Sequence, residues 1–286
     1  MLPRKTNFPT MCLDLTKREH VEILLDLIRT ESARIAHIHL APPCGAASMA
    51  RAKPIPELVS LGLPSPQPLR SKQYPTGLPG LTGVDKERVM AANVLYSASC
   101  LIAHVAIGLN IRVSIENPLK SLFWLTDDVA DLLNAKPEAS PVRFAHCMMG
   151  SNRDKQTLWW TSNHDFDSLN LQCDKSHKHA SWAPRRHPVS GRIVYATAQE
   201  AAYLELLCSR VAHLVLEHSL QVPRPQALYG PSAVATRPVL GKPTKTLQKG
   251  VSEFRACDVW GLDAGSLTWI MFWHFIQRGR ELSVGN

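Results

Sequence analysis

The sequence predicts an α/β fold with a mostly parallel central sheet. An apolar run from Ile35 to Ala41 has the length and composition of a buried strand. A helical pattern precedes this run, and an uncharged helical stretch and a second β-like run follow it. Because a β-α-β order favours parallel pairing, these observations together predict the fold class.

The first two elements are a helix and a strand. Residues 16–30 are expected to be helical, because apolar side chains recur at helical spacing at Val21, Leu24, Leu25 and Ile28. Thr16 is the expected N-cap, with Glu19 completing a capping box. The strand that follows should stop at Pro42 and Pro43, since proline cannot continue a ladder of hydrogen bonds.

A long loop and a long helix follow. Residues 53–83 are rich in proline and glycine and are expected to form a loop. The uncharged stretch 89–110 is long enough to span a membrane. Polar residues interrupt this stretch, and a β-like run follows at once, so we expect a buried core helix and no membrane partner.

The remaining elements are shorter. A second strand is expected at 111–115, ending in the polar cluster Glu116-Asn117-Pro118. Beyond it the pattern indicates a helix at 119–133, β-like runs at 142–147 and 157–161, and an amphipathic helix at 197–216.

Length and composition indicate one large domain and a small appendage. We divide the chain into a core at 11–161, a His- and Trp-rich segment with a packing helix at 162–218, and a basic, irregular region at 219–286. The net charge of +8 favours a polyanionic partner. Seven scattered cysteines without a Cys-x-x-Cys pair or a signal peptide indicate a reducing intracellular compartment, which would be the nucleus in a eukaryote.

Polar groups recur where the predicted strands end. Cys44 follows the first strand, the Glu116-Asn117 pair follows the second, and Arg153-x-Lys155 lies between the two β-like runs. A thiol at the carboxyl edge of a sheet is a typical position for a nucleophile in α/β enzymes. Taken singly, each motif also fits an inert turn or a solvated loop.

As a set, these motifs resemble the cytosine-C5 DNA methyltransferases. That family has a Pro-Cys nucleophile loop, a Glu-Asn pair and a basic Gln-x-Arg-x-Arg-like segment in this order, on a Rossmann-like sheet. Pro43, Cys44 and Ser48 match its Pro-Cys-x-x-x-Ser pattern. The similarity covers about 11–161 and is closest to the divergent methyltransferase-like domains of transposable-element proteins, which carry Ala-Pro-Pro-Cys-Gly and Ile-Glu-Asn-Pro.

The resemblance implies a reaction and a role for each residue. S-adenosylmethionine would donate a methyl group to C5 of a flipped cytosine in DNA, with RNA left open as a substrate. Cys44 would add to C6, and Glu116 would donate a hydrogen bond or proton at N3. The remaining assignments are Arg153 and Lys155 at the base carbonyl or a phosphate, and Asp14, Pro43, Asn117 and Pro118 around the cofactor and base.

The chain departs from the family at the cofactor motif. No Phe-x-Gly-x-Gly turn precedes Asp14, so the expected fold lacks an obvious first βα unit. A displaced glycine loop at 260–265 is disfavoured, because no βαβ pattern follows it. The main alternative is therefore a catalytically inactive nucleic-acid-binding module derived from a mobile-element methyltransferase. A cysteine hydrolase is less favoured, because no histidine is placed to activate Cys44.

A second constellation has the residue types that bind zinc. Cys173, His177 and His179 lie close together in sequence, and Cys147 could supply a fourth ligand. The spacing is not that of a standard zinc finger, and a polar loop around a packed tryptophan is the favoured interpretation of the segment. We therefore assign no metal from the sequence and keep these four residues as zinc candidates.

Overall fold

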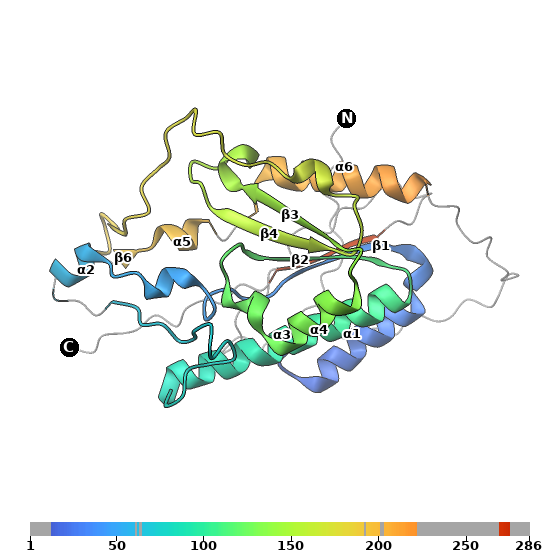
Figure 1. Cartoon of the computed structure of the whole chain (residues 1–286), viewed down its shortest axis with the longest axis horizontal. Helices are drawn as coiled ribbons and strands as arrows, with labels where there is room; N and C mark the ends of the chain where they lie inside the picture. The colour runs from blue at the N-terminus through green and yellow to red at the C-terminus, as the bar shows by residue number, and fades with distance from the viewer. Residues whose placement is uncertain are drawn as a thin grey trace, which may run out of the picture.

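The computed structural model describes residues 13–60, 62, 65–191, 193–200, 203–221 and 269–274. Its centre is a five-stranded sheet with the order β3-β4-β2-β1-β7. Helices cover both faces of this sheet, with α1, α3 and α4 on one face and α6 on the other (Figure 1). The strands are β1 (Ile35–Ala41), β2 (Arg112–Pro118), β3 (Ser140–Ala145), β4 (Gln156–Thr161) and β7 (Trp269–His274).

The fold is of the mixed α/β class, and its central sheet contains both parallel and antiparallel strand pairs. β1 pairs in parallel with both β2 and β7, as the β-α-β order predicted for β1 and β2. β4 is antiparallel to β2 and to β3. The short connection between β3 and β4, which contains the 3-10 turn η4 (His146–Met149), explains the reversal, because a parallel crossover needs a dozen residues or more.

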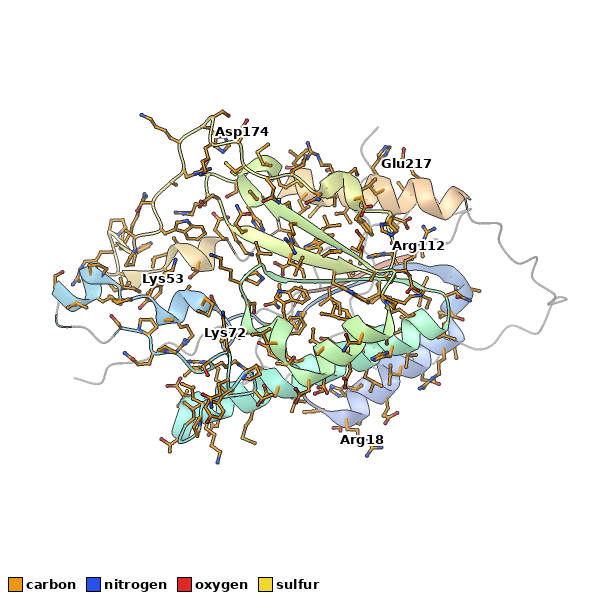
Figure 2. The ribbon with its side chains drawn as sticks, viewed as in Figure 1. Arg18, Lys53, Lys72, Arg112, Asp174 and Glu217 are labelled. Carbon is orange, nitrogen blue, oxygen red and sulfur yellow. The ribbon has the colours of Figure 1, made fainter. Side chains whose placement is uncertain are left out.

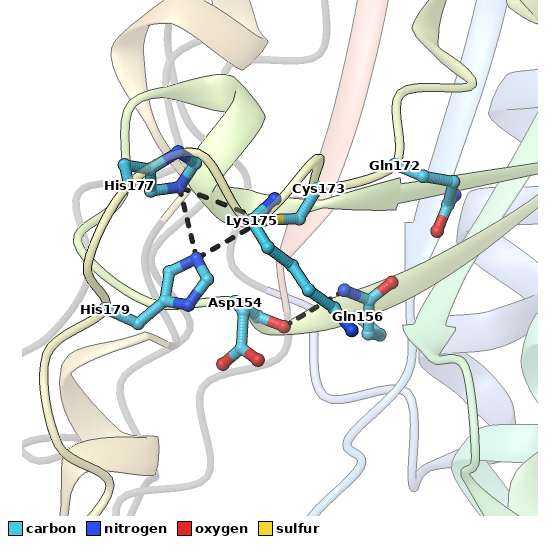
Figure 3. Close-up of a pocket in the computed structure, with 7 residues that line it drawn as sticks. All are labelled: Asp154, Gln156, Gln172, Cys173, Lys175, His177 and His179. Carbon is cyan, nitrogen blue, oxygen red and sulfur yellow. Dashed lines mark hydrogen bonds between the residues drawn. The ribbon is translucent and has the colours of Figure 1, made fainter.

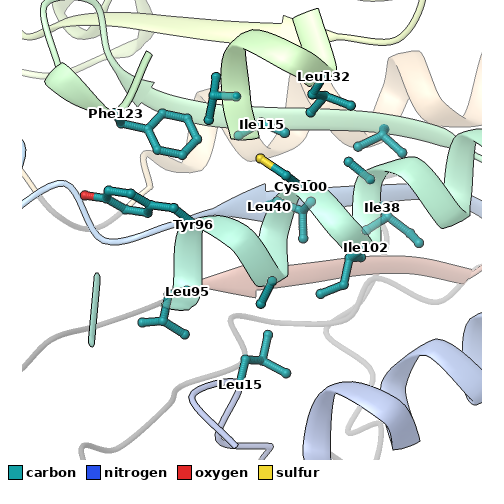
Figure 4. Packing of buried hydrophobic residues seen from close by; sticks show 14 of the residues in the cluster. Leu15, Ile38, Leu40, Leu95, Tyr96, Cys100, Ile102, Ile115, Phe123 and Leu132 are labelled. Carbon is teal, nitrogen blue, oxygen red and sulfur yellow. The ribbon is translucent and has the colours of Figure 1, made fainter. Parts of the chain in front are cut away.

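One face of the sheet packs on α1 (Arg18–Thr30), α3 (Gly83–Gly108) and α4 (Asp127–Ala135). Leucine and isoleucine side chains from these helices meet those of β1 and β2 in the larger hydrophobic cluster. Figure 4 shows Tyr96 and Cys100 of α3 beside Leu40, Ile115 and Phe123. All five of these side chains are buried.

The other face packs on α6 (Glu205–Gln221). Its buried side chains Leu207, Val211 and Val215 meet Phe144 of β3 and Trp159 of β4 in a second cluster. This helix was expected as one continuous element at 197–216. It is instead preceded by a separate turn of helix, α5 (Ala196–Gln199), and begins only at Glu205.

The uncharged stretch forms the core helix that the sequence predicted. α3 is long and apolar enough to cross a membrane by length and composition. Half of its most apolar window is buried inside the protein, where it contacts α1, α4 and the sheet. Contacts with other elements of the chain bury this part of α3, as expected for a helix that packs on a sheet.

Several predicted boundaries were wrong. α1 begins at Arg18 with Lys17 as its N-cap, and no side chain caps it. The capping box at Thr16 and Glu19 is absent, because the Thr16 hydroxyl instead donates to the Asp14 carboxylate at 2.6 Å. The predicted helix at 119–133 is divided into a 3-10 turn, η3 (Leu122–Leu125), and α4.

The proline-rich loop is largely irregular, as predicted. It contains one short helix, α2 (Pro56–Ser60), and follows the 3-10 turn η2 (Met49–Ala52). A small two-stranded hairpin, β5 (Arg185–Arg186) with β6 (Ile193–Val194), lies outside the main sheet. The remaining 3-10 turns are η1 (Ser32–Arg34) and η5 (Asp167–Leu169).

The C-terminal region 219–286 was expected to be irregular, and this is wrong for its two described segments, the end of α6 at 219–221 and the strand β7. β7 completes the sheet on the free side of β1, where Ala41 pairs with His274 in parallel register. The carboxyl end of β7 therefore lies at the same sheet edge as the end of β1. The glycine loop considered at 260–265 lies outside the described residues.

Candidate functional site

The candidate site lies at the carboxyl edge of the parallel strands. The loop after β1 carries Cys44, while Glu116 and Asn117 belong to the last residues of β2. The sequence placed this pair after the strand, but β2 continues to Pro118 because Glu116 and Asn117 pair with Trp159 and Leu158 of β4. The connection from β3 to β4 brings Lys155 to the same edge, because β3 runs in the same direction as β2.

Two hydrogen bonds from neighbouring elements fix the Cys44 loop. The Asn117 amide donates to the carbonyl oxygen of Pro42 at 2.9 Å. The Tyr96 hydroxyl donates to the carbonyl oxygen of Pro43 at 2.8 Å. The Cys44 carbonyl then accepts from the Ala47 amide at 3.0 Å, which closes a tight turn. The thiol is thus presented by a turn that is held from α3 and from β2.

Cys44, Glu116 and Lys155 form one electrostatic unit. Burial raises the pKa of the Cys44 thiol, and the negative charge of Glu116 raises it further, while the Lys155 ammonium opposes both effects. Nζ of Lys155 lies 3.6 Å from Oε1 of Glu116. At neutral pH Cys44 is therefore a thiol, and it needs a proton acceptor nearby to become a thiolate.

Two buried oxygens at this edge have no hydrogen-bond partner within the described part of the chain. They are Oε1 of Glu116, which has only the longer contact with Lys155, and Oδ1 of Asn117. Buried polar atoms are rarely left unpaired in folded proteins. Both acceptors are therefore available to a ligand that carries hydrogen-bond donors, such as the edge of a base.

Arg153 does not join this unit. Its guanidinium donates to Oε1 of Glu200 at 3.1 Å and to the carbonyl oxygen of Ser181 at 3.1 Å. It also lies over the ring of Trp182, 5.8 Å from the ring centre. These contacts make Arg153 an anchor between the β3–β4 connection and the segments after β4.

Glu200 is the residue that sequence reasoning missed. Besides Arg153, its carboxylate accepts from the Ser151 hydroxyl at 2.8 Å, and its backbone oxygen accepts from Nζ of Lys155 at 3.2 Å. The side chain is buried. No local motif marks this glutamate, and only its burial among Ser151, Arg153 and Lys155 reveals its role.

Two of the residues expected around the cofactor, Asp14 and Pro118, form hydrogen bonds with residues close to them in sequence. The Asp14 carboxylate accepts from the backbone amide of Thr16 at 3.1 Å and from its hydroxyl. The Pro118 carbonyl accepts from the Trp124 indole at 3.0 Å. No glycine-rich turn follows a strand among the residues that the structure describes. The described site therefore holds a thiol, a carboxyl group and an ammonium group, without a glycine-rich turn for a nucleotide.

The zinc candidates come together in space, at the other end of the β3–β4 connection. Cys147, Cys173, His177 and His179, here called the Cys2His2 cluster, place their ligand atoms within 4.8 Å of one another. A pocket of about 470 Å³ lies against this cluster and is lined by Asp154, Gln156, Gln172 and Lys175 together with three of the ligands (Figure 3).

The charges around Cys44 predict opposite effects of two substitutions on its reactivity. Glu116→Gln removes the negative charge that raises the thiol pKa, so alkylation at pH 7.5 should be faster by about tenfold for each pKa unit. Lys155→Met removes the positive charge and should slow the reaction. The rates are measured by mass spectrometry of the Cys44 peptide after iodoacetamide treatment. Glu138→Gln, at an exposed carboxylate, is the control, and equal rates in all four proteins would contradict the assignment.

The structure thus gathers Cys44, Glu116 and Lys155, with Pro43 and Asn117 supporting the loop, and leaves Arg153 and Asp14 with other partners. No family model, no curated protein and no solved structure matches this chain, so the function proposed below rests on the sequence motifs and on the geometry of the site.

Proposed function

We propose that this chain is a cytosine-C5 DNA methyltransferase-type domain, with Cys44 as the nucleophile and S-adenosylmethionine as the methyl donor. The carrying observation is the meeting of Cys44, Glu116 and Lys155 at one sheet edge, from three segments that are far apart in sequence. A mixed α/β sheet with helices on both faces supports a Rossmann-like scaffold for this site.

The chemistry follows from the three side chains. The Cys44 thiolate forms a bond to C6 of cytosine, and the electron pair of the C5–C6 double bond moves into the ring toward C5 and N3. The Glu116 carboxylate takes up the proton that Cys44 releases, and the resulting carboxyl donates that proton or a hydrogen bond to N3, where negative charge develops. The ammonium of Lys155 stabilises the thiolate and lies 3.6 Å from the Glu116 carboxyl that would contact the base.

Loss of the Cys44 proton is the step that this environment controls. Because burial and Glu116 both raise the thiol pKa, the free enzyme keeps Cys44 protonated. A Glu116 carboxyl that shares its charge with the base no longer opposes thiolate formation, so base binding and nucleophile activation are coupled. The coupling would protect the thiol from side reactions when no base is bound.

The methyl donor would supply an electrophilic methyl group to the activated C5 and leave as S-adenosylhomocysteine. Loss of the C5 proton and departure of the Cys44 thiolate from C6 would then restore the C5–C6 double bond. Oδ1 of Asn117 is a buried acceptor that a bound group could use. The described residues contain no glycine-rich turn after a strand, so S-adenosylmethionine enters this proposal from the family resemblance alone. The net charge of +8 supports a polyanionic substrate, and binding to DNA should weaken steeply as salt is raised.

Two assays test the nucleophile and the cofactor separately. Addition at C6 makes C5 basic, so the protein should release tritium from DNA that carries 5-tritiated cytosine, even without a cofactor. With S-adenosylmethionine and 5-fluorocytosine in the DNA, a denaturation-resistant adduct should form, since fluorine cannot leave C5 as a proton does. Cys44→Ala should abolish both signals, while Cys208→Ser, at a half-buried cysteine of α6, should preserve them.

The raised pKa of Cys44 and the lack of a described glycine-rich turn favour a second candidate, a catalytically silent nucleic-acid-binding module. This candidate predicts salt-dependent DNA binding without tritium release or adduct formation. Tritium release without the fluorocytosine adduct would show a working nucleophile and no methyl transfer. Absence of both signals on DNA that the protein binds would reject catalysis by Cys44.

A further inference from the structure

The Cys2His2 cluster is close to the dimensions of a tetrahedral metal site, with all four ligand atoms within 4.8 Å of one another. Sγ of Cys173 lies 3.4 Å from Nε2 of His179 and 3.9 Å from Nε2 of His177, and the two Nε2 atoms are 3.1 Å apart. Sγ of Cys147 joins them within 4.8 Å. In a zinc site with Zn–S of about 2.3 Å and Zn–N of about 2.0 Å, neighbouring ligand atoms are roughly 3.3–3.8 Å apart.

The ligands come from two segments and converge on one point. Cys147 lies in η4, directly after β3, and the other three lie in the irregular segment after η5. Figure 3 shows Cys173, His177 and His179 turned toward one another, with both histidines presenting Nε2. Between them, Lys175 adopts a left-handed backbone with φ of 62°. Such a conformation is unusual for a residue other than glycine, and it returns the chain to place His177 near Cys173.

The surrounding groups suit a metal-bound thiolate. The backbone amide of Lys175 donates to Sγ of Cys173 at 3.3 Å, which would stabilise negative charge on the sulfur. Oδ1 of Asp174 lies 3.9 Å from Nδ1 of His177, on the ring side opposite the cluster. In metal sites, a carboxylate commonly accepts a hydrogen bond from the histidine nitrogen that does not bind the metal, and this contact orients the ring.

The segment that carries three of the ligands is attached to the rest of the protein mainly by hydrogen bonds. Residues 170–184 form no helix or strand, and no residue from 171 to 184 is buried. Figure 2 shows Asp174 at the outer turn of this segment, away from the sheet. Without an apolar core, a defined conformation here needs another source of stability, which a bound ion provides.

From these observations we propose that Cys147, Cys173, His177 and His179 bind one structural Zn²⁺ ion. Two thiolates and two imidazoles satisfy the four positions that zinc prefers, and a closed set of four protein ligands is typical of a structural site. Thiolate ligands disfavour magnesium and calcium, which take oxygen ligands.

The ion would also fix the β3–β4 connection. The ligand segment is joined to this connection by the Ala180 amide, which donates to Asn152 at 2.7 Å, and by the Trp182 indole, which donates to Asp154 at 2.9 Å. In the opposite donor direction, Arg153 of the connection donates to the carbonyl oxygen of Ser181 in the ligand segment. Zinc therefore holds the segment on which Lys155 is carried to Glu116. Zinc binding itself does not depend on the proposed methyl transfer.

Metal content of the purified full chain tests this site. Protein from zinc-supplemented cells, dialysed without chelator, should contain about one zinc ion per chain by mass spectrometry of the metal. His177→Ala should lose it, and His177→Cys, which keeps a zinc-binding group, should retain it. His164→Ala, at an exposed histidine outside the cluster, should match the wild type.

A second readout uses the wild type alone, in case a ligand variant fails to fold. Chelation should open the 171–184 segment to trypsin at Lys175 and Lys178, and added zinc should restore protection. Cobalt(II) in place of zinc should give the visible absorption of a tetrahedral thiolate site. The proposal would be overturned if the folded wild type contained no more zinc per chain than the His177→Ala variant. A Cys147–Cys173 disulfide in protein purified without reductant would overturn it as well.

Discussion

Acidification below pH 6.5 should sharply reduce the free energy of unfolding of this protein. Burial and the charge of Arg112 lower the pKa of His37 to about 3, and burial and the charge of Lys155 lower the pKa of His146 to about 3. In the unfolded chain both rings titrate near pH 6.5. Between these values the unfolded state binds protons that the folded state does not, so stability falls as pH falls, by about 1.4 kcal/mol per pH unit for each histidine.

The environments of the two rings explain why they stay neutral. Nε2 of His37 lies 2.8 Å from the Ser114 hydroxyl on β2, and the ring packs against Phe166. Nε2 of His146 lies 2.9 Å from the Thr157 hydroxyl. The carboxylate of Glu200 lies 3.8 Å from Nδ1 of His146. Because the lowered pKa leaves this ring uncharged at neutral pH, the contact with Glu200 is not an ion pair.

Urea unfolding at a series of pH values between 7 and 4 measures this effect. His37→Gln and His146→Gln should each remove about 1.4 kcal/mol per pH unit from the slope, since glutamine keeps a hydrogen-bonding group and does not titrate. His164→Gln is the matched control, because the side chain of His164 is 70% exposed. Equal slopes in all of these proteins would contradict the neutral state of the two buried rings.

Arg153→Met should destabilise the protein by about 3–5 kcal/mol, because it leaves the buried carboxylate of Glu200 without its cation. The side chains of Arg153 and Glu200 are 10% and 9% exposed, and their atoms are 3.1 Å apart. Glu200→Leu should destabilise the protein by a similar amount, because it leaves the buried guanidinium of Arg153 without its carboxylate. The double variant Arg153→Met/Glu200→Leu removes both charges and should be more stable than either single variant.

Denaturant unfolding of the four proteins forms a double-mutant cycle for this pair. Arg34→Ala is the matched control, since Arg34 and Glu31 form an ion pair with side chains 41% and 38% exposed. An exposed pair of this kind should contribute less than about 1 kcal/mol. Additive effects of the two Glu200–Arg153 changes would show that the buried pair does not act as a unit.

The sequence was most informative where one chemical signal dominated. The apolar run that ends at two prolines marked β1 with its observed limits, because a run this short between such breaks is typical of a buried strand. The uncharged stretch likewise marked α3, although the helix begins earlier, at Gly83. Cys44 and Glu116 could be placed at one sheet edge, since parallel strands bring their carboxyl ends together.

The rest depended on contacts between distant segments. The strand direction of β4 followed from a short connection that the sequence did not mark as a hairpin. Arg153 looked like a ligand-binding cation, and its pairing with Glu200 required a fold that no local pattern encodes. The Cys2His2 cluster lacked finger-like spacing because its ligands belong to two segments, joined in space by the β3–β4 hairpin.

The position of β7 has a consequence for biosynthesis. β1 lies between β2 and β7, but more than two hundred residues separate β1 from β7 along the chain. At about 5–20 residues per second, translation needs roughly ten seconds or longer to deliver the missing neighbour. Until then β1 is an apolar edge strand with unpaired backbone groups, a template for pairing with other chains. The greatest aggregation hazard of this fold therefore falls during its synthesis, at the strand that leads into Cys44.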